Sequence, residues 1–216
     1  MSILLIVPVL VILVFSAVFH EVAHGWMALR FGDSTARDYG RLTLNPIPHI
    51  DPMLTIFLPM MLMLLGMPII GGAKPVPVDY QNLHPFRSGV FWVGAAGILT
   101  NFIIVAVVGI MLRLLMAFDM AADITIVILS LIIWINCILG LFNLLPMPPL
   151  DGSKMLFSAL GLSYDQQVAI EMNSRYFLIG LIVLVVFMPG SLSFLFASID
   201  FLFQLAAGFS FSALTG

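Results

Sequence analysis

Two histidines and a glutamate interrupt the first apolar segment of this chain. His20, Glu21 and His24 follow residues 3–18, which are almost all Ile, Leu, Val, Phe or Ala. Ionisable side chains at bilayer depth cost about 2.5–3.5 kcal/mol each, so those that occur there usually have a function. On an α-helix, residues four apart point in similar directions and lie about 6 Å apart along the axis. His20 and His24 can therefore bind one metal ion together.

Glu21 lies one residue further round the same helix, where its carboxylate is poorly placed to bind that ion. It can instead hold and deprotonate a water molecule on the metal, as in the H-E-x-x-H motif of zinc hydrolases. Zinc lowers the pKa of a bound water to about 7 and polarises a peptide carbonyl. The alternatives are a chance motif or polar side chains that hydrogen-bond neighbouring helices. Without a partner, such groups would be costly in lipid.

A catalytic zinc ion needs a third protein ligand and one open position. The candidates for this ligand are His49, Asp51, Asp79, His84 and Asp151. Asp151 is the strongest, because it lies in a proline-rich break after an apolar run, and irregular backbone at membrane depth must be buried in protein or line a cavity. Its alternative role is that of an N-cap for a helix starting at Gly152. His49 and Asp51 lie in a polar connector and fit surface or turn positions better.

The composition is that of an integral membrane protein. Of the 216 residues, 62% are hydrophobic and only 9% are charged, and the mean hydropathy is +1.16. Soluble domains average about 25% charged residues. The net charge of −3 gives no reason to expect a nucleic-acid partner. The single cysteine, Cys137, excludes an intrachain disulfide.

The apolar runs predict an all-α polytopic membrane protein, a bundle of about five to six membrane segments in a single domain covering residues 1–216. Long helices are expected at 3–31, 89–118 and 124–145, and shorter apolar runs cover 53–70, 176–188 and 191–211. The first run has neither a basic flank nor a small-residue cleavage site, so we expect a retained membrane helix. The run at 53–70 is short and contains Pro59, which favours a re-entrant or partial segment. The alternating KPVPV predicts a short extended or strand element at 73–78.

Two motifs, far apart in the chain, together resemble a known family. H-E-V-A-H at residues 20–24 lies on an expected membrane helix, and FNLLPMPPLDG at residues 142–152 follows a later one. This pair resembles the site-2 protease family of intramembrane zinc metalloproteases. GRLTLNPIPHIDP at residues 40–52 and GGAKPVPV at residues 71–78 are similar to the short, single-domain bacterial branch of that family.

The resemblance implies one zinc ion per chain, bound by His20, His24 and Asp151, with Glu21 as the general base. It also implies a role near the substrate for Asn101, in a stretch where Ile98 replaces the proline of the family's motif. The alternative for Asn101 is a hydrogen bond between helices.

The implied activity is hydrolysis of a peptide bond within or next to a transmembrane helix of a membrane-protein substrate in the lipid bilayer. Because such a helix must unwind before cleavage, the strand at 73–78, with Val76 and Val78, could pair with the unwound substrate. A metal-binding membrane protein without proteolysis, such as a transporter or an inactive scaffold, is the alternative. A transporter would be expected to carry polar groups on more than one helix, and a set of ligands alone would not need Glu21.

The third ligand also constrains the topology. If both histidines and Asp151 bind one ion, the first helix and the helix before Asp151 must leave the membrane on the same side. The tight turn at 119–123 makes the two helices beside it antiparallel, so the helix at 89–118 starts on the side where Asp151 emerges. The first helix ends on that same side. The chain between these two helices therefore begins and ends on one side, and the segment at 53–70 cannot be a complete crossing. All basic residues except Arg113 then fall on one side, which the positive-inside rule identifies as the cytosol. We therefore expect a multi-pass protein of the cytoplasmic membrane with its active site toward the cytosolic half.

Overall fold

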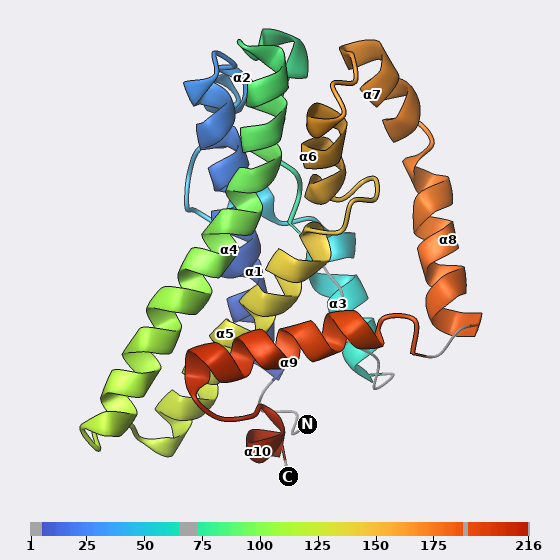
Figure 1. Cartoon of the computed structure of the whole chain (residues 1–216). Helices are drawn as coiled ribbons and strands as arrows, with labels where there is room; N and C mark the ends of the chain where they lie inside the picture. Colours follow the sequence, from blue (N-terminus) through green and yellow to red (C-terminus); the bar gives the residue numbers. More distant parts are fainter. Residues whose placement is uncertain (1–5, 65–72, 188–189, 216) are drawn as a thin grey trace.

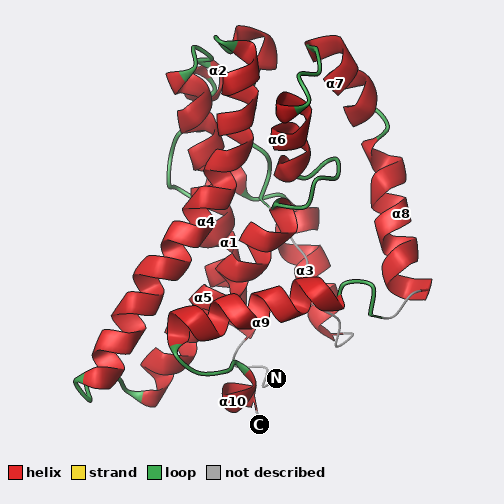
Figure 2. Ribbon diagram, viewed as in Figure 1, coloured by secondary structure: helices red, strands yellow, loops and turns green. Residues whose placement is uncertain are grey.

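The computed structural model describes residues 6–64, 73–187 and 190–215. Within these ranges the chain folds into helices joined by loops, without a β-strand (Figures 1 and 2). The α-helices are α1 (Ile6–Arg30), α2 (Thr35–Asp38), α3 (Leu58–Leu64), α4 (Phe86–Ala117), α5 (Asp123–Asn143), α6 (Asp151–Ala159), α7 (Tyr164–Glu171), α8 (Ser174–Phe187), α9 (Ser193–Ala207) and α10 (Ser212–Thr215). The described residues therefore confirm the predicted all-α class.

Three of these helices, α1, α4 and α5, are long and apolar enough to cross a membrane. They match the three long helices expected from the sequence, and Asp119, at φ 54°, lies in the tight turn between α4 and α5. Within the described residues, α3, α8 and α9 have 7, 14 and 15 residues, fewer than the roughly 20 that cross a bilayer. A membrane protein is thus supported, while the number of five to six membrane segments stays a prediction.

The main apolar core joins α4, α5 and α9. Leu112, Ile133 and Phe203, one from each helix, have no exposed surface. The Trp134 ring meets the Phe203 ring edge to face, with the centroids 5.8 Å apart. α9 lies across the other two helices, toward the end of the bundle opposite α2 and α7 (Figure 1). This packing holds α4 and α5 together at that end of the bundle.

The segment predicted to be re-entrant begins and ends at one place. It starts with a turn of π-helix at Pro52–Phe57 and continues as α3. The Lys74 N–H donates to the His49 carbonyl at 2.7 Å, so the chain returns to the point where it left. This closure agrees with the expected partial crossing, although residues 65–72 lie outside the described part. Residues 73–78 form neither helix nor strand, so the strand at that position stays a prediction.

Asp33 ties the end of α1 to the loop that precedes α4. Its buried carboxylate accepts hydrogen bonds from the N–H of Asp79 at 2.9 Å, the N–H of Thr35 at 3.1 Å and the Asn82 side chain at 3.2 Å. Burial alone would raise the pKa of Asp33, but the hydrogen bonds from Thr35, Asn82 and Asp79 outweigh it and hold this pKa below its usual value. Residues 50–73, which lie between the hydrogen-bonded His49 and Lys74, are called the 50–73 segment or excursion below. The connectors on both sides of it are thus fixed to the end of α1.

Asp33→Ala is expected to lower the free energy of unfolding by about 1–3 kcal/mol at neutral pH, because its donors lose a charged acceptor. The folded-state pKa lies below the unfolded value of about 3.9. The stabilisation is therefore complete above that value and disappears as the pH falls through the folded-state pKa. Melting temperatures in detergent at neutral and acid pH measure the effect. Asp38→Ala, at an exposed pair with Arg37, is the control, and equal losses for both variants at neutral pH would contradict this role.

Candidate metal centre

The proline-rich loop after α5 brings Asp151 to the two histidines of α1. Asp151 is the first residue of α6, and Leu150 is its N-cap, so the alternative of Asp151 as an N-cap is wrong. The loop folds back so tightly that a Cβ on Gly152 would collide with the main-chain oxygens of Leu144 and Leu145. A glycine after Asp151 therefore lets the carboxylate face α1.

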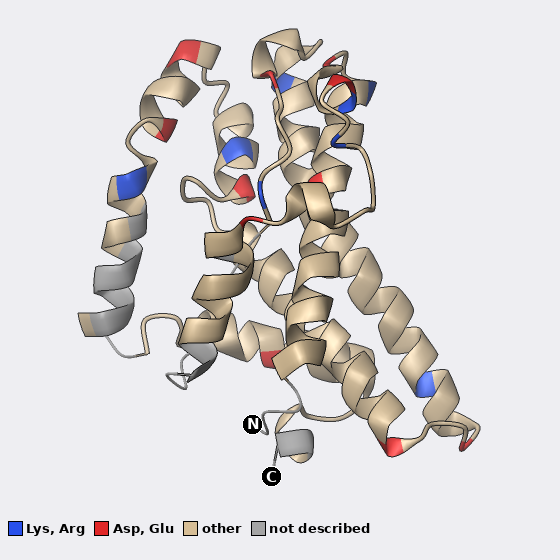
Figure 3. Ribbon diagram, turned by 180° about the vertical axis from the view of Figure 1, so that it is seen from behind, with Lys and Arg blue, Asp and Glu red and all other residues tan. Residues whose placement is uncertain are grey.

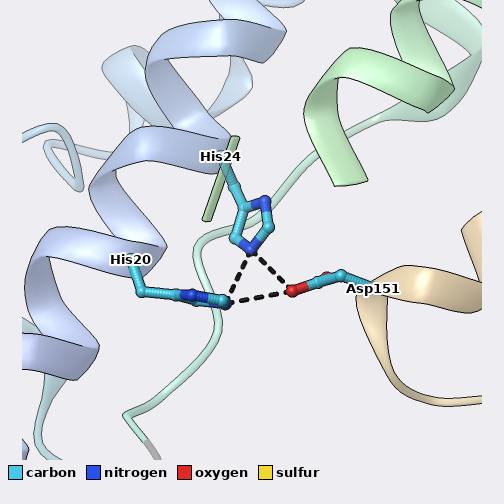
Figure 4. A group of neighbouring side chains, drawn as sticks. All are labelled: His20, His24 and Asp151. Atoms are coloured by element: carbon cyan, nitrogen blue, oxygen red, sulfur yellow. Dashed lines mark hydrogen bonds and ion pairs between the residues drawn. The ribbon is translucent and has the colours of Figure 1, made fainter. Parts of the chain in front are cut away.

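The three predicted ligands meet at one point (Figure 4). The Nε2 atoms of His20 and His24 are 3.0 Å apart, and the Oδ2 atom of Asp151 lies 3.0 Å from the first and 3.1 Å from the second. These spacings are close to the value of about 3.3 Å between ligands of a tetrahedral zinc ion with bonds of about 2.0–2.1 Å. All three side chains are buried. Two histidines and a carboxylate are a known donor set for catalytic zinc.

Hydrogen bonds from the far side of each imidazole fix which nitrogen faces this point. His24 Nδ1 lies 2.6 Å from the Val93 carbonyl oxygen, and His20 Nδ1 lies 3.2 Å from Asn101 Oδ1. Since both partners are acceptors, each Nδ1 carries a proton, and the Nε2 atom whose lone pair a neutral imidazole offers to a metal points inward. Two lone pairs and a carboxylate oxygen therefore converge in a buried space. That arrangement is stabilised by a cation.

The other carboxylate oxygen of Asp151 faces a lysine on the same helix. Lys154 Nζ lies 3.6 Å from Asp151 Oδ1, three residues along α6. The same ammonium group lies 5.5 Å from the centroid of the Tyr80 ring. Asp151 therefore directs one oxygen toward the histidines while the other stays next to a positive charge.

Glycines on α4 let that helix pass directly against the site. A Cβ on Gly97 would lie 2.5 Å from both His20 Cε1 and His24 Nε2. A Cβ on Gly94 would lie 3.0 Å from the Asp151 main-chain oxygen. Small residues such as those at 94–97 permit close helix packing, but their sequence does not indicate that the neighbour is the candidate metal centre.

Glu21 lies beside the three ligands and is not one of them. Its Oε2 atom accepts a hydrogen bond of 2.8 Å from the N–H of Val76, in the segment after the 50–73 excursion. The carboxylate is partly exposed, whereas the histidines are buried. This placement is the one expected of a base that acts beside the metal.

The other candidates for the third ligand lie elsewhere. Among the described residues, His20, His24 and Asp151 form the group whose ligand atoms approach closely enough for one ion. His49 is buried, its Nε2–H donates to the Thr43 carbonyl at 3.0 Å, and burial lowers its pKa. Asp79 is the N-cap of the short helix at Tyr80–Asn82, and His84 is exposed. These residues build the connectors.

Comparisons with known proteins point to zinc metalloproteases. The model of peptidase family M50 matches residues 114–187. The candidate zinc metalloprotease YwhC of Bacillus subtilis (strain 168) is 41% identical over 161 residues, which cover 70% of this chain and 68% of YwhC.

Two candidate zinc metalloproteases named Rip2 are more distant. Rip2 of Mycolicibacterium smegmatis is 31% identical over 135 residues, which cover 62% of this chain and 49% of that protein. Rip2 of Mycobacterium tuberculosis (strain H37Rv) is 31% identical over 165 residues, which cover 76% of this chain and 61% of that protein. The chain thus spans about half to two thirds of the Rip2 proteins. No solved structure matches it. From the extent of the match to YwhC, together with the family model, the chain belongs to peptidase family M50, the site-2 protease family of zinc metalloproteases.

Proposed function

We propose that this protein is a zinc-dependent endopeptidase that hydrolyses a peptide bond within or next to a transmembrane helix. The observation that carries the proposal is the convergence of two imidazole lone pairs and a carboxylate on one buried point of a helix long enough to cross the membrane. His20, His24 and Asp151 would hold one zinc ion per chain. When bound, the ion would activate water and polarise the scissile carbonyl.

Glu21 supplies the proton chemistry. Its carboxylate takes the proton of the attacking water and then delivers it to the leaving nitrogen of the substrate. The ring N–H groups of His20 and His24 stay on the Asn101 and Val93 oxygens and keep both Nε2 atoms turned inward. A protein that only binds metal would not need an acid or base at this place.

Asn101 is proposed to have both of the roles that its position in the sequence left open. Its Oδ1 atom accepts from His20, while its Nδ2 atom is buried without a hydrogen-bond partner among the described residues. A buried donor without a partner costs about 1–3 kcal/mol. We propose that this N–H group turns to the substrate carbonyl oxygen, where a donor stabilises the charge that develops during attack.

Asn101→Asp is expected to keep zinc and lower the rate constant kcat by about 10²-fold, because the acceptor for His20 remains and the donor is lost. Asn101→Leu removes both groups and is expected to weaken zinc binding as well. Zinc content and kcat of the two purified variants are the measurements. Wild-type kcat in Asn101→Asp would leave only the orientation of His20 for this residue.

The substrate would be a membrane protein that presents an unwound stretch of helix to the site from the bilayer. The segment at 73–78, which contains Val76 and Val78, runs beside Glu21 and is the part of the chain next to which we expect the substrate to lie. Its backbone is not part of a helix or a sheet. Because Glu21 holds the Val76 N–H, an extended substrate would pair with other main-chain groups of this segment.

The protein is proposed to span the cytoplasmic membrane with the site toward the cytosolic half. Lys and Arg gather toward the end of the molecule that carries α2 and α7 (Figure 3). Arg113, near the other end of α4, donates to the main chain of α9. Positive charge on one side marks the cytosolic face.

Single cysteines in a Cys137→Ser background test this orientation. Asp38→Cys and Gln81→Cys, at exposed positions on either side of the 50–73 segment, are expected to react with a membrane-impermeant thiol reagent from the cytosolic side only. Met120→Cys, exposed in the turn between α4 and α5, is expected to react from the other side. Labelling of the first two from opposite sides would break the topology, and with it Asp151 as the third ligand.

The function itself is tested by cleavage in reconstituted liposomes. Purified protein is mixed with a panel of single-span membrane proteins, and the masses of the products locate the broken bond. We expect breaks within or next to the span that stop when a chelator removes the metal and resume when zinc returns. A protein that binds zinc and cleaves nothing in the panel would favour the alternative of a metal-binding membrane protein without proteolysis.

A further inference from the structure

The segment at 73–78 is held in place by bonds to its main chain. Arg41, in the loop after α2, donates from Nη2 to the Lys74 carbonyl at 2.8 Å and to the Pro75 carbonyl at 3.3 Å. The Lys74 N–H donates to the His49 carbonyl. One residue beyond these contacts, the Val76 N–H donates to Glu21. The guanidinium of Arg41 is therefore linked to the carboxylate of Glu21 through three residues of backbone.

The surface of α1 is shaped to receive this segment. Gly25 lies one turn after Glu21, and a Cβ there would lie 2.9 Å from Val76 Cγ1 and 2.6 Å from Leu42 Cδ2. The Val76 side chain is 6% exposed, so it is packed against the helix beside the carboxylate. Any larger residue at Gly25 would press on the Val76 and Leu42 side chains that pack there.

The two prolines make this N–H distinctive. Pro75 and Pro77 have no N–H, so Val76 offers the single main-chain donor of residues 75–77. That donor points at Glu21. The alternation of proline and valine thus leaves one hydrogen-bond donor at the place where the carboxylate needs to be fixed.

We propose that Arg41 and the Val76 N–H are positioning groups for Glu21, with Arg41 holding the segment at Lys74 and Pro75 so that the Val76 N–H fixes the carboxylate beside the metal site. The proposal rests on the proposed function, in which Glu21 is the base. It assigns a role to the GRLTLNP motif, which contains Arg41 but lies outside the ligand set. A substrate strand that pairs with Val76 would have to take this N–H from Glu21.

Hydrogen exchange tests the arrangement without using activity. Because residues 75–77 contain one amide, exchange in this stretch reports the Val76 N–H alone. Glu21→Ala is expected to speed its exchange roughly tenfold or more, since the N–H loses a charged acceptor, whereas Glu21→Gln keeps an acceptor oxygen and is expected to change it less. Arg41→Leu is expected to speed exchange to a similar extent as Glu21→Ala. Arg37→Leu, at an exposed arginine that pairs with its neighbour Asp38, is the matched control and is expected to leave this exchange unchanged.

Kinetics of the same variants test the consequence. Arg41→Leu is expected to keep the wild-type zinc content and to lower kcat at least tenfold, because a displaced base slows the chemical step. Arg41→Lys keeps the charge without the planar donor geometry, and its kcat is expected to lie between those of the wild type and Arg41→Leu. Unchanged exchange at Val76 and unchanged kcat in Arg41→Leu would overturn the proposal. A rise in KM at constant kcat would also overturn it, because the segment would then serve substrate binding alone.

Failure of this proposal differs from failure of the proposed function. If Glu21→Gln cleaves like the wild type, the assignment of the base is wrong whatever Arg41 does. If Glu21→Gln is inactive while Arg41→Leu is fully active, the base is right and the positioning groups are not.

Discussion

Glu21→Gln is expected to retain about one zinc ion per chain and to lose cleavage by about 10²–10⁴-fold, the usual contribution of a positioned general base. The proposed ligands are His20, His24 and Asp151, whose inward atoms lie 3.0–3.1 Å apart, while the Glu21 carboxylate accepts a hydrogen bond from the Val76 N–H. Removing its charge therefore leaves the donor set intact. Zinc by elemental analysis and kcat on one single-span substrate measure the two effects.

Comparison with a ligand variant makes this result specific. His24→Ala removes one of three donors and is expected to lose most of the zinc together with activity. If Glu21→Gln lost zinc as readily as His24→Ala, then Glu21 would be a ligand and the roles assigned to these residues would be wrong.

Gly97→Ala is expected to weaken zinc binding by about 10–100-fold, the range seen when the surroundings of metal ligands are disturbed. The new methyl carbon would lie 2.5 Å from both His20 Cε1 and His24 Nε2, closer than real Cβ contacts allow. The rings cannot turn aside freely, because Asn101 and Val93 hold their outer nitrogens. Either α4 moves away from α1 or the inward nitrogens separate.

Gly180→Ala is the matched control, since a Cβ on this glycine of α8 meets no atom within 4 Å. Competition with a chromophoric chelator gives the zinc affinity of each variant. Wild-type affinity in Gly97→Ala would show that the close approach of α4 to the two histidines is not needed for the site.

The three residues that converge could be predicted to do so because each carries a local signature. His20 and His24 have the spacing that places two side chains on one face of a helix, and Asp151 stands in a proline-rich break where an apolar chain has no other use for a carboxylate. The structure brings these residues together although His20 and Asp151 are 131 residues apart in the sequence. Only the pairing of two distant motifs could predict such a contact.

The groups that support the ligands were harder to predict. Val93 contacts His24 through its main-chain carbonyl, so the identity of its side chain gives no signal in the sequence. The bond between Glu21 and Val76 depends on how the 50–73 excursion returns to the bundle. Such a return is set by tertiary packing, and hydrophobic periodicity does not contain it.

The helices were predictable where apolar length decides them. α1, α4 and α5 have mean hydropathies of 2.3, 2.4 and 2.6 over their most apolar windows, so burial in lipid or protein dictates their positions. After Tyr176 the apolar runs are shorter and their partners are not encoded locally. α9 lies across α4 and α5 (Figure 1), and Phe203 is buried in the apolar core that the three helices share.

Two histidines of α1 and Asp151 are proposed to hold zinc in the membrane domain of this M50 peptidase. The most direct measurement is the X-ray absorption spectrum at the zinc edge of the purified protein. We expect a shell of about four nitrogen and oxygen neighbours at about 2.0–2.1 Å, with the multiple-scattering signal of two imidazoles, and loss of the bound zinc in Asp151→Ala. A spectrum with one imidazole or none, or an unchanged zinc environment in Asp151→Ala, would contradict the account.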